Sequence, residues 1–291
     1  MSLKIVVLAK QVPDTRNVGK DAMTPEGTVN RAALPAIFNP EDLNALEQAL
    51  RLKDEHPGST VHILTMGPPR ATEVIREGLY RGADGGFLLT DRAFAGADTL
   101  ATSYALAQAI RKIGMPDIVI GGRQAIDGDT AQVGPQVAQK LDLNQVTYVT
   151  AIESVKEGKI RVVRHIDGGM ERVEAPLPIL LTVNGNAASC RPRNAKLVMK
   201  YKRALAPLER PADGNLPYAE EYEKKPYLNV TQWSVADVDG DLEQCGLSGS
   251  PTKVKAVQNI VFKAKESKRL TAADSDVESL VKELLDSHTI G

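Results

Sequence analysis

The chain has 291 residues, 42% of them hydrophobic, and its 36 basic side chains nearly balance 37 acidic ones to leave a net charge of −1. This composition supports one large domain or a domain with an appendage, and the near-neutral charge argues against a nucleic-acid-binding protein, which is usually basic overall. No apolar run is long enough to cross a bilayer and no export signal stands at the N-terminus, so we expect a cytoplasmic protein with reduced cysteines and no membrane insertion.

The first half of the chain alternates strand and helix patterns. Strands are predicted at residues 4–10, 60–67, 86–91 and 117–122, and helices at residues 39–58, 69–83, 98–114 and 130–142. Asn39 and Asp98 stand at helix N-cap positions, and Pro40 suits the first turn of its helix. Because the strands are apolar on both faces, they predict a mostly parallel sheet covered by helices on both sides, a doubly wound α/β fold.

From about residue 146 the pattern changes to strands joined by tight turns. The segments "KEGK" and "IDGG" are hairpin signals, and "PILLTV" at 178–183 ends this antiparallel addition to the sheet. The four histidines are scattered, so no metal site is expected.

The last third of the chain predicts an appendage. Four segments follow one another: a basic stretch at 191–203, an extended arm at 205–230, an element at 248–261 with Ser250 as cap and Pro251 in its first turn, and an amphipathic helix at 274–290. We therefore expect a nucleotide-binding α/β domain at 1–204 and, at 205–291, a C-terminal arm and helix that clasp a larger partner subunit.

The richest candidate site is "GGRQAIDGDTAQVG", residues 121–134, which follows the strand at 117–122. Ligands of open parallel sheets bind beyond the carboxyl ends of the strands. The helix start at 130–133 would present free backbone N–H groups to an anion. Gly134 would allow a ligand to approach closely, and Arg123 would neutralise a phosphate or a reduced ligand.

The two aspartates of this loop need separate explanations. Asp129 is expected to cap the following helix, and Asp127 to bond a sugar hydroxyl or to hold the shape of the loop. The alternative is an ordinary glycine-rich connection with capping acids, because neither the dinucleotide fingerprint nor the P-loop motif is present.

The stretch "GRQAIDGDTAQVGP" at 122–135 closely resembles the nucleotide loop of electron-transfer flavoprotein beta subunits. Further resemblances follow in the family's order: "KIVVLAKQVPD", "FNPEDLNALEQAL", "TMGPP", "GADTLATSYALAQAI", "IDGGMERVEAPLPILLTV" and "GLSGSPTKV". This resemblance spans nearly the whole chain. It implies an adenine nucleotide alpha-hydrolase-like fold and a heterodimer with a larger, FAD-carrying alpha subunit. It also implies electron exchange with an acyl-CoA dehydrogenase or a quinone reductase.

The resemblance also implies an adenine nucleotide between the strand ends of this subunit. Ordinary members of the family bind AMP there. Electron-bifurcating members bind a second FAD, which takes hydride from NADH and passes one electron to a low-potential acceptor such as ferredoxin or flavodoxin and one to the alpha FAD. The small Gly128 and Ala131 leave room for a second phosphate, and Arg123 would stabilise a flavin anion, so FAD is favoured over AMP.

Carried onto this chain, the resemblance places the nucleotide contacts on residues from four segments. They are Ala9, Asn39, Pro40, Glu41, Asp42, Met66, Arg123, Gln124, Ala125, Ile126, Asp127, Gly128, Asp129, Thr130, Ala131, Gln132, Val133 and Gly134.

The basic stretch matches the family's partner-recognition loop, with one departure. That loop usually reads Pro-Arg-Tyr and then a leucine, whereas Asn194 stands here in place of the tyrosine. Leu197 is the candidate anchor for an acidic redox partner. The basic residues around it are Arg191, Arg193, Lys196 and Lys200. The alternatives for this stretch are a solvated basic helix and a nucleic-acid patch.

Two rival interpretations of the whole chain stay open at this point. A non-redox AMP-binding module of the universal-stress-protein type would share the sheet and the loop, but it would not explain the hairpins or the arm. A subunit that binds AMP only for its own stability, with the redox chemistry in its partner, is the ordinary case of the family.

Overall fold

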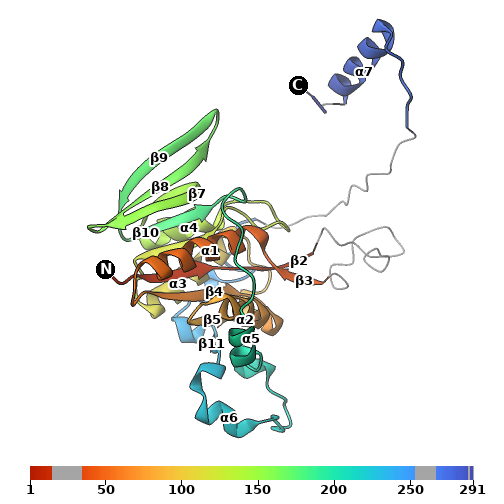
Figure 1. Ribbon diagram of the computed structural model, residues 1–291. Helices are drawn as coiled ribbons and strands as arrows, with labels where there is room; N and C mark the ends of the chain where they lie inside the picture. Colours follow the sequence, from red (N-terminus) through yellow and green to blue (C-terminus); the bar gives the residue numbers. More distant parts are fainter. Residues whose placement is uncertain (15–34, 253–266, 288, 291) are drawn as a thin grey trace. The chain divides into compact units, whose positions relative to one another are not determined.

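The computed structural model describes residues 1–14, 35–252, 267–287 and 289–290. The chain forms two compact units, Met1–Lys255 and Ala256–Gly291. The described part of the first unit is built around a nine-stranded sheet (Figure 1). Its strands lie in the order β11 (Thr231–Trp233), β5 (Gly85–Leu89), β4 (Thr60–Met66), β1 (Lys4–Leu8), β6 (Ile118–Gly122), β10 (Ile179–Val183), β7 (Asn144–Lys156), β8 (Lys159–Ile166) and β9 (Gly169–Pro176).

The sheet is parallel from β11 to β7 and antiparallel from β7 to β9. The two hairpins expected after residue 146 are therefore confirmed. The expectation that residues 178–183 end this antiparallel addition is wrong, because β10 pairs in parallel with both β6 and β7. A separate antiparallel pair, β2 (Gln11–Pro13) with β3 (Ala36–Phe38), follows the carboxyl end of β1. The first predicted strand thus ends at Leu8 rather than at residue 10.

Helices cover both faces of the parallel part of the sheet. One face is covered by α1 (Pro40–Glu55) and α2 (Thr72–Arg81), and the other by α3 (Thr99–Ile113) and α4 (Val133–Leu141). The other helices in the described residues are α5 (Ala195–Tyr201) and α6 (Ala219–Lys224) in the first unit and α7 (Asp274–Asp286) in the second. Short 3-10 turns lie at η2 (Pro69–Ala71), η3 (Arg92–Phe94), η4 (Pro207–Glu209), η5 (Pro226–Leu228), η6 (Ala236–Val238) and η7 (Leu242–Gln244).

The core has two layers because successive strand residues point to opposite faces. Ile5 and Val7 of β1 lie in one apolar cluster with Leu46 of α1, whereas Val6 lies in the other with Ile110 of α3. The expected doubly wound, mostly parallel α/β fold is confirmed.

The two predicted N-caps have different outcomes. The Asp98 carboxylate accepts the N–H groups of Leu100 and Ala101 at 2.9 and 3.0 Å, as a cap should. Asn39 occupies the cap position of α1, but its side chain makes no capping bond. The prediction for Asn39 is wrong because its amide is used elsewhere, at the loop after β6.

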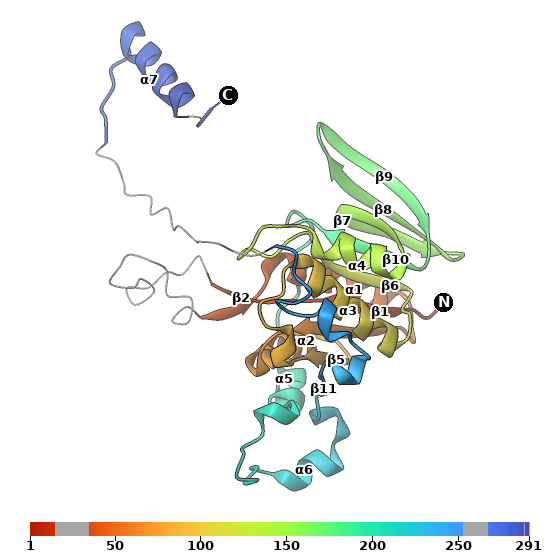
Figure 2. The same cartoon turned by 180° about the vertical axis from the view of Figure 1, so that it is seen from behind.

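The predicted arm belongs to the first unit and forms a projecting loop with short helices (Figure 1). Residues 205–230 include η4, α6 and η5, and the two ends of this excursion meet, since the N–H of Val230 donates to Leu205 O at 2.9 Å. The chain then forms β11, which pairs with β5 at the edge of the sheet, opposite to the hairpin edge (Figure 2). The division expected at residue 205 is therefore not a boundary between compact units.

Of the two predictions at the C-terminal end, the element at 248–261 lies mostly outside the described residues, and the terminal helix is shorter than expected. Ser250 begins no helix within the described residues; its buried hydroxyl donates to Gly246 O and accepts the N–H of Asp98, and positions 253–261 lie outside the described residues. The terminal helix is α7, and it ends at Asp286 rather than at residue 290. No helix in the described part of the chain is long and apolar enough to span a membrane.

Candidate functional site

The candidate site lies at the carboxyl ends of β1 and β6, which are neighbours in the sheet. Leu8 pairs with Gly121 there, and the chain leaves the two strands toward Lys10 and Arg123. From β1 the order of the sheet runs to β4 on one side and to β6 on the other, so this is the point where the winding direction changes. Ligands of doubly wound sheets bind at such a point.

The first half of the loop, residues 122–127, is fastened by the start of α1. Asn39 Nδ2 donates to Gln124 O at 2.9 Å, and Asn39 Oδ1 accepts the N–H of Ile126 at 3.2 Å. The Glu41 carboxylate accepts the N–H of Gln124 at 3.0 Å and pairs with the Arg123 guanidinium at 3.1 Å. These side chains, predicted as nucleotide contacts, hold the shape of the loop.

Asp42 joins the ends of the two strands. Its Oδ2 accepts the N–H of Lys10 at 2.8 Å, and its Oδ1 accepts the N–H of Gly122 at 2.9 Å. A Cβ at position 122 would lie 2.5 Å from Asp42 Oδ1, so only glycine fits there. Burial raises the pKa of Asp42 to about 7, although the two N–H donors and Asn39 oppose the shift.

Arg123, which follows the carboxyl end of β6, has two side-chain neighbours. Besides the pair with Glu41, its guanidinium lies 5.4 Å from the centroid of the Tyr148 ring. Glu41, and to a smaller extent Tyr148, raise the pKa of Arg123, so the cation stays charged. Its charge is already balanced by a carboxylate, which the sequence pattern did not indicate.

The two aspartates of the loop hold it in different ways. Asp127 forms an ion pair with Lys10 at 2.8 Å, in line with the expectation that it holds the loop shape. Asp129 has a φ of 50° and accepts a hydrogen bond from the Gln124 side chain at 2.7 Å. The N-cap of α4 is Gln132, so the predicted capping by Asp129 is wrong.

The second half of the loop, residues 128–132, presents backbone donors. The helix begins at Val133, three residues later than predicted. Within the described part of the chain, no acceptor is bonded to the N–H groups of Thr130, Ala131, Gln132 or Val133. Such donors at the positive end of a helix dipole attract anions. Space is open around Gly128, where an added Cβ would meet nothing within 4 Å.

Gly134 has a different role from the one predicted. A Cβ at this position would lie 2.7 Å from Thr182 Cγ2, so the glycine lets α4 pack against β10. The glycine therefore has a packing role that the sequence pattern did not indicate, and the predicted ligand contact stays a prediction.

The rest of the predicted contact set lies on the same edge. Ala9 is buried, Met66 is partly buried, and Pro40 is the first residue of α1. Thr65, next to Met66 at the end of β4, has a buried hydroxyl with no hydrogen-bond partner in the described chain. Sequence reasoning missed it, although a polar residue inside the apolar run "HILTMG" is a usable signal.

The basic stretch is only partly a free surface. Leu197 on α5 is half-buried and packs against the core, whereas Met199 is 66% exposed. Asn194 caps α5 by accepting the N–H groups of Lys196 and Leu197 at 3.0 and 3.3 Å. The residue that replaces the family's tyrosine therefore starts the helix that carries the candidate anchor.

Two of the four basic side chains near Leu197 are engaged with acids. Arg191 pairs with Glu47 at 3.0 Å, and Arg193 pairs with Glu77 at 2.5 Å. The Lys200 ammonium lies 4.6 and 4.7 Å from two tyrosine rings, those of Tyr201 and Tyr227. Lys196 is exposed.

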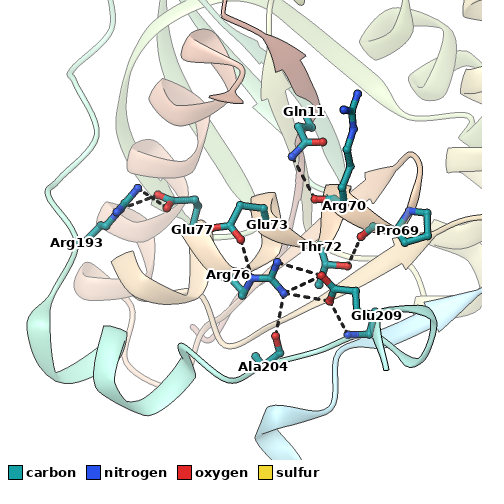
Figure 3. A network of polar contacts seen from close by, with 11 residues as sticks. Gln11, Pro69, Arg70, Thr72, Glu73, Arg76, Glu77, Arg193, Ala204 and Glu209 are labelled. Carbon is teal, nitrogen blue, oxygen red and sulfur yellow. Dashed lines mark hydrogen bonds and ion pairs between the residues drawn. The ribbon is translucent and has the colours of Figure 1, made fainter. Parts of the chain in front are cut away.

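A neighbouring network fastens the base of the arm to α2 (Figure 3). The Arg76 guanidinium contacts both oxygens of Glu209 at 3.0–3.1 Å, and it also donates to Glu73 and to Ala204 O. Glu209 in turn accepts the N–H of Ala206 at 3.0 Å. The base of the arm is therefore fixed to α2.

Other reactive groups are few. Both cysteines are free, and burial raises the pKa of the Cys190 thiol to about 11. Among the described residues, no cluster of three or more His, Cys, Asp or Glu side chains could hold a metal ion.

Comparison with known proteins gives consistent matches. Residues 26–206 match the family model described as electron transfer flavoprotein domain. The chain is 44% identical to the CarD subunit of the caffeyl-CoA reductase-Etf complex of Acetobacterium woodii, over 87% of this chain and 86% of that protein. It is 40% identical to the electron transfer flavoprotein subunit beta of Megasphaera elsdenii, over 96% and 98%. It is also 40% identical to the acryloyl-CoA reductase electron transfer subunit gamma of Anaerotignum propionicum, over 99% and 100%.

Proposed function

Because the chain belongs to the electron transfer flavoprotein family, as a subunit of the beta type, we propose that its crevice binds FAD and that the complex it forms is electron-bifurcating. Its general role, electron transfer as the small subunit of a flavoprotein, follows from the family. The rival interpretation as a non-redox module of the universal-stress type does not agree with this membership.

The observation that carries the proposal is the row of unbonded N–H groups at residues 130–133, next to the open space at Gly128. A diphosphate carries more charge and volume than the single phosphate of AMP, so it needs more donors and more room. The described residues therefore fit a dinucleotide.

Each part of the site would have its own task. Residues 130–133 would hold the phosphates, and Arg123 would offset negative charge that the ligand gains when it is reduced. Asn39, Glu41 and Asp42 would keep the loop in place without moving during the reaction. When bound, FAD would accept hydride and release electrons singly, which no side chain of this chain can do.

The partners are proposed from the family and from the names of relatives. Two relatives are named as parts of acyl-CoA reductase systems, the caffeyl-CoA and acryloyl-CoA reductases. We expect this chain to pair with an alpha subunit that carries its own FAD, and to exchange electrons with a flavoenzyme of the acyl-CoA dehydrogenase type. NADH as donor, and ferredoxin or flavodoxin as second acceptor, belong to the bifurcating proposal.

A specific observation favours AMP as the second candidate. The Arg123 charge is already balanced by Glu41 at 3.1 Å. A neutral pair adds less attraction for an extra negative charge than a free guanidinium does. In that case the nucleotide would only stabilise the subunit, and the redox chemistry would lie in the alpha subunit.

The experiment counts flavin and AMP released per heterodimer and then titrates the complex with NADH without oxygen. Two FAD, one of them reduced by NADH and less readily so in Arg123→Ala, are expected. One FAD and one AMP, with no bleaching by NADH, would falsify the bifurcating proposal and leave the family assignment intact.

A further inference from the structure

One aromatic residue in β7 has a backbone conformation that suits it poorly. Tyr148 has a φ of 60°, in the left-handed region where bulky side chains are rare. It lies on a bulge: Val146 pairs with Leu181 and Val149 with Val183, so two residues of β7 face Thr182 alone. Bulges re-aim side chains and are frequent beside active sites.

The bulge separates Tyr148 from its neighbours in the strand. Val146 and Val149 are both buried in the same cluster, although residues three apart point to opposite faces of a regular strand. Tyr148 is 37% exposed and is turned toward Arg123 instead. A glycine or an asparagine would make this backbone at lower cost, so the presence of a tyrosine indicates a use for the ring.

The ring and a carboxylate hold the same cation from two elements. The Glu41 carboxylate, at the start of α1, contacts Arg123 at 3.1 Å, and the Tyr148 ring, on β7, lies 5.4 Å from the guanidinium. Glu41 is held in turn by the N–H of Gln124 at 3.0 Å. With neighbours on two elements, the guanidinium has little freedom to turn away from the crevice.

We propose that Tyr148 is a positioning residue, which the bulge aims at Arg123 so that ring and carboxylate together fix the guanidinium where a bound adenine nucleotide meets it. This inference rests on the proposed function only in requiring that the crevice binds such a nucleotide. The effect of Tyr148 on the ligand then passes through Arg123.

A double-mutant cycle tests this. Heterodimers of the wild type, Tyr148→Leu, Arg123→Gln and the double variant are stripped of the small-subunit nucleotide and titrated with FAD and, separately, with AMP. Tyr148→Leu keeps a bulky side chain at the same positive φ, so the backbone strain is similar, but it removes the aromatic ring. It should weaken binding about two- to fivefold, the range of a partly exposed cation–ring contact. In the Arg123→Gln background the same change should have no further effect.

Tyr148→Phe is the matched control because it keeps the ring, and its affinity should stay close to that of the wild type. An equal loss from Tyr148→Leu in both backgrounds, or a loss in Tyr148→Phe as large as that in Tyr148→Leu, would overturn the inference. Melting temperatures identify any variant that fails to fold; if Tyr148→Leu does, Tyr148→Asn, which also lacks the ring and suits a positive φ, replaces it in both backgrounds.

The two nucleotides separate this inference from the proposed function. If only AMP binds and follows the expected pattern, the bifurcating proposal fails and Tyr148 keeps its role. If FAD binds but the two substitutions act independently, the role of Tyr148 fails and the function stands. If the wild-type complex binds neither FAD nor AMP, both the role of Tyr148 and the proposed function are wrong.

Discussion

At the scale of single residues, the most unusual group is the buried carboxyl of Asp42. It accepts backbone N–H groups from the ends of both β1 and β6, so it fixes the separation of the two strands that border the crevice. Burial raises its pKa from 3.8 to about 7. Burial therefore makes the ionised carboxylate of Asp42 unfavourable, although the N–H groups of Lys10 and Gly122 need its two oxygens as hydrogen-bond acceptors.

The pKa of Asp42 predicts how stability depends on pH. Between 3.8 and about 7 the unfolded chain releases a proton that the folded protein keeps, so stability falls as the pH rises through this window. Relative to Asp42→Asn, the wild type should lose about 1–3 kcal/mol between about pH 5 and pH 8, as measured by urea unfolding.

The control is Asp117→Asn, at the other end of the same two strands. Asp117 also accepts a strand N–H, that of Lys4 at 2.7 Å, but it is only half-buried. If Asp42→Asn and Asp117→Asn change the pH dependence of the free energy of unfolding equally, the burial of Asp42 does not explain that dependence.

At the scale of elements, the basic stretch that contains α5 combines structural and free charges. Glu47 on α1 is buried, and burial opposes its ionisation, but its hydrogen bonds with Arg191 and Arg51 lower its pKa. Arg191 therefore belongs to the attachment of this stretch to α1. Lys196 is exposed, so its charge is available to a partner.

Two substitutions separate these roles. Arg191→Ala should cost about 1–3 kcal/mol of stability in denaturant unfolding, because it removes the main partner of a buried carboxylate. Lys196→Ala should change stability by less than about 0.5 kcal/mol, and should make association with an acidic redox partner slower and less salt-dependent. Equal effects on stability would contradict this division.

The junction between α2 and the arm is a second place where charged side chains hold two elements together. The side chains of Arg76 and Glu209 are 13% and 15% exposed, and Arg76 also holds Ala204 O. Glu209→Gln should therefore destabilise the protein by about 1–3 kcal/mol and should speed amide exchange at residues 204–210.

Glu220→Gln is the matched control, since its pair with Lys224 is 84% and 71% exposed and should contribute less than about 0.5 kcal/mol. Unchanged exchange at 204–210 would show that the arm is held by other contacts.

At the scale of the whole molecule, the two compact units divide the chain at 255/256. The described helix of the second unit, α7, exposes apolar side chains at helical spacing. They are Val277, Leu280, Val281 and Leu285. An apolar face of this kind is stable only when something covers it, and we expect the alpha subunit to do so.

Removing residues 256–291 tests this expectation. The first unit contains the complete nine-stranded sheet, so its melting temperature should change by less than about 3 °C. Co-purification with the alpha subunit should fall sharply. The matched control is a full-length chain with Glu278→Gln on the same helix, which should keep the partner. Retention of the partner by the shortened chain would place the main contact in the first unit.

The sequence by itself determined the elements and their class. Short continuous apolar runs mark the parallel strands, tight-turn residues mark the hairpins, and a period of 3.6 marks the helices, because these patterns are local in the chain. The capping role of Asp98 and the family were equally readable from short stretches. These are features that neighbours in the chain decide.

Only the tertiary structure decided which groups meet across the sheet. Asn39 is placed like a cap but binds Gln124 and Ile126, 85 and 87 residues away, and Gly134 makes room for Thr182. The pairing of Arg123 with Glu41, and the bulge that turns Tyr148 toward it, likewise depend on long-range register. Side-chain partners are chosen by proximity in the folded chain, and a spacing pattern carries no information about proximity between distant segments.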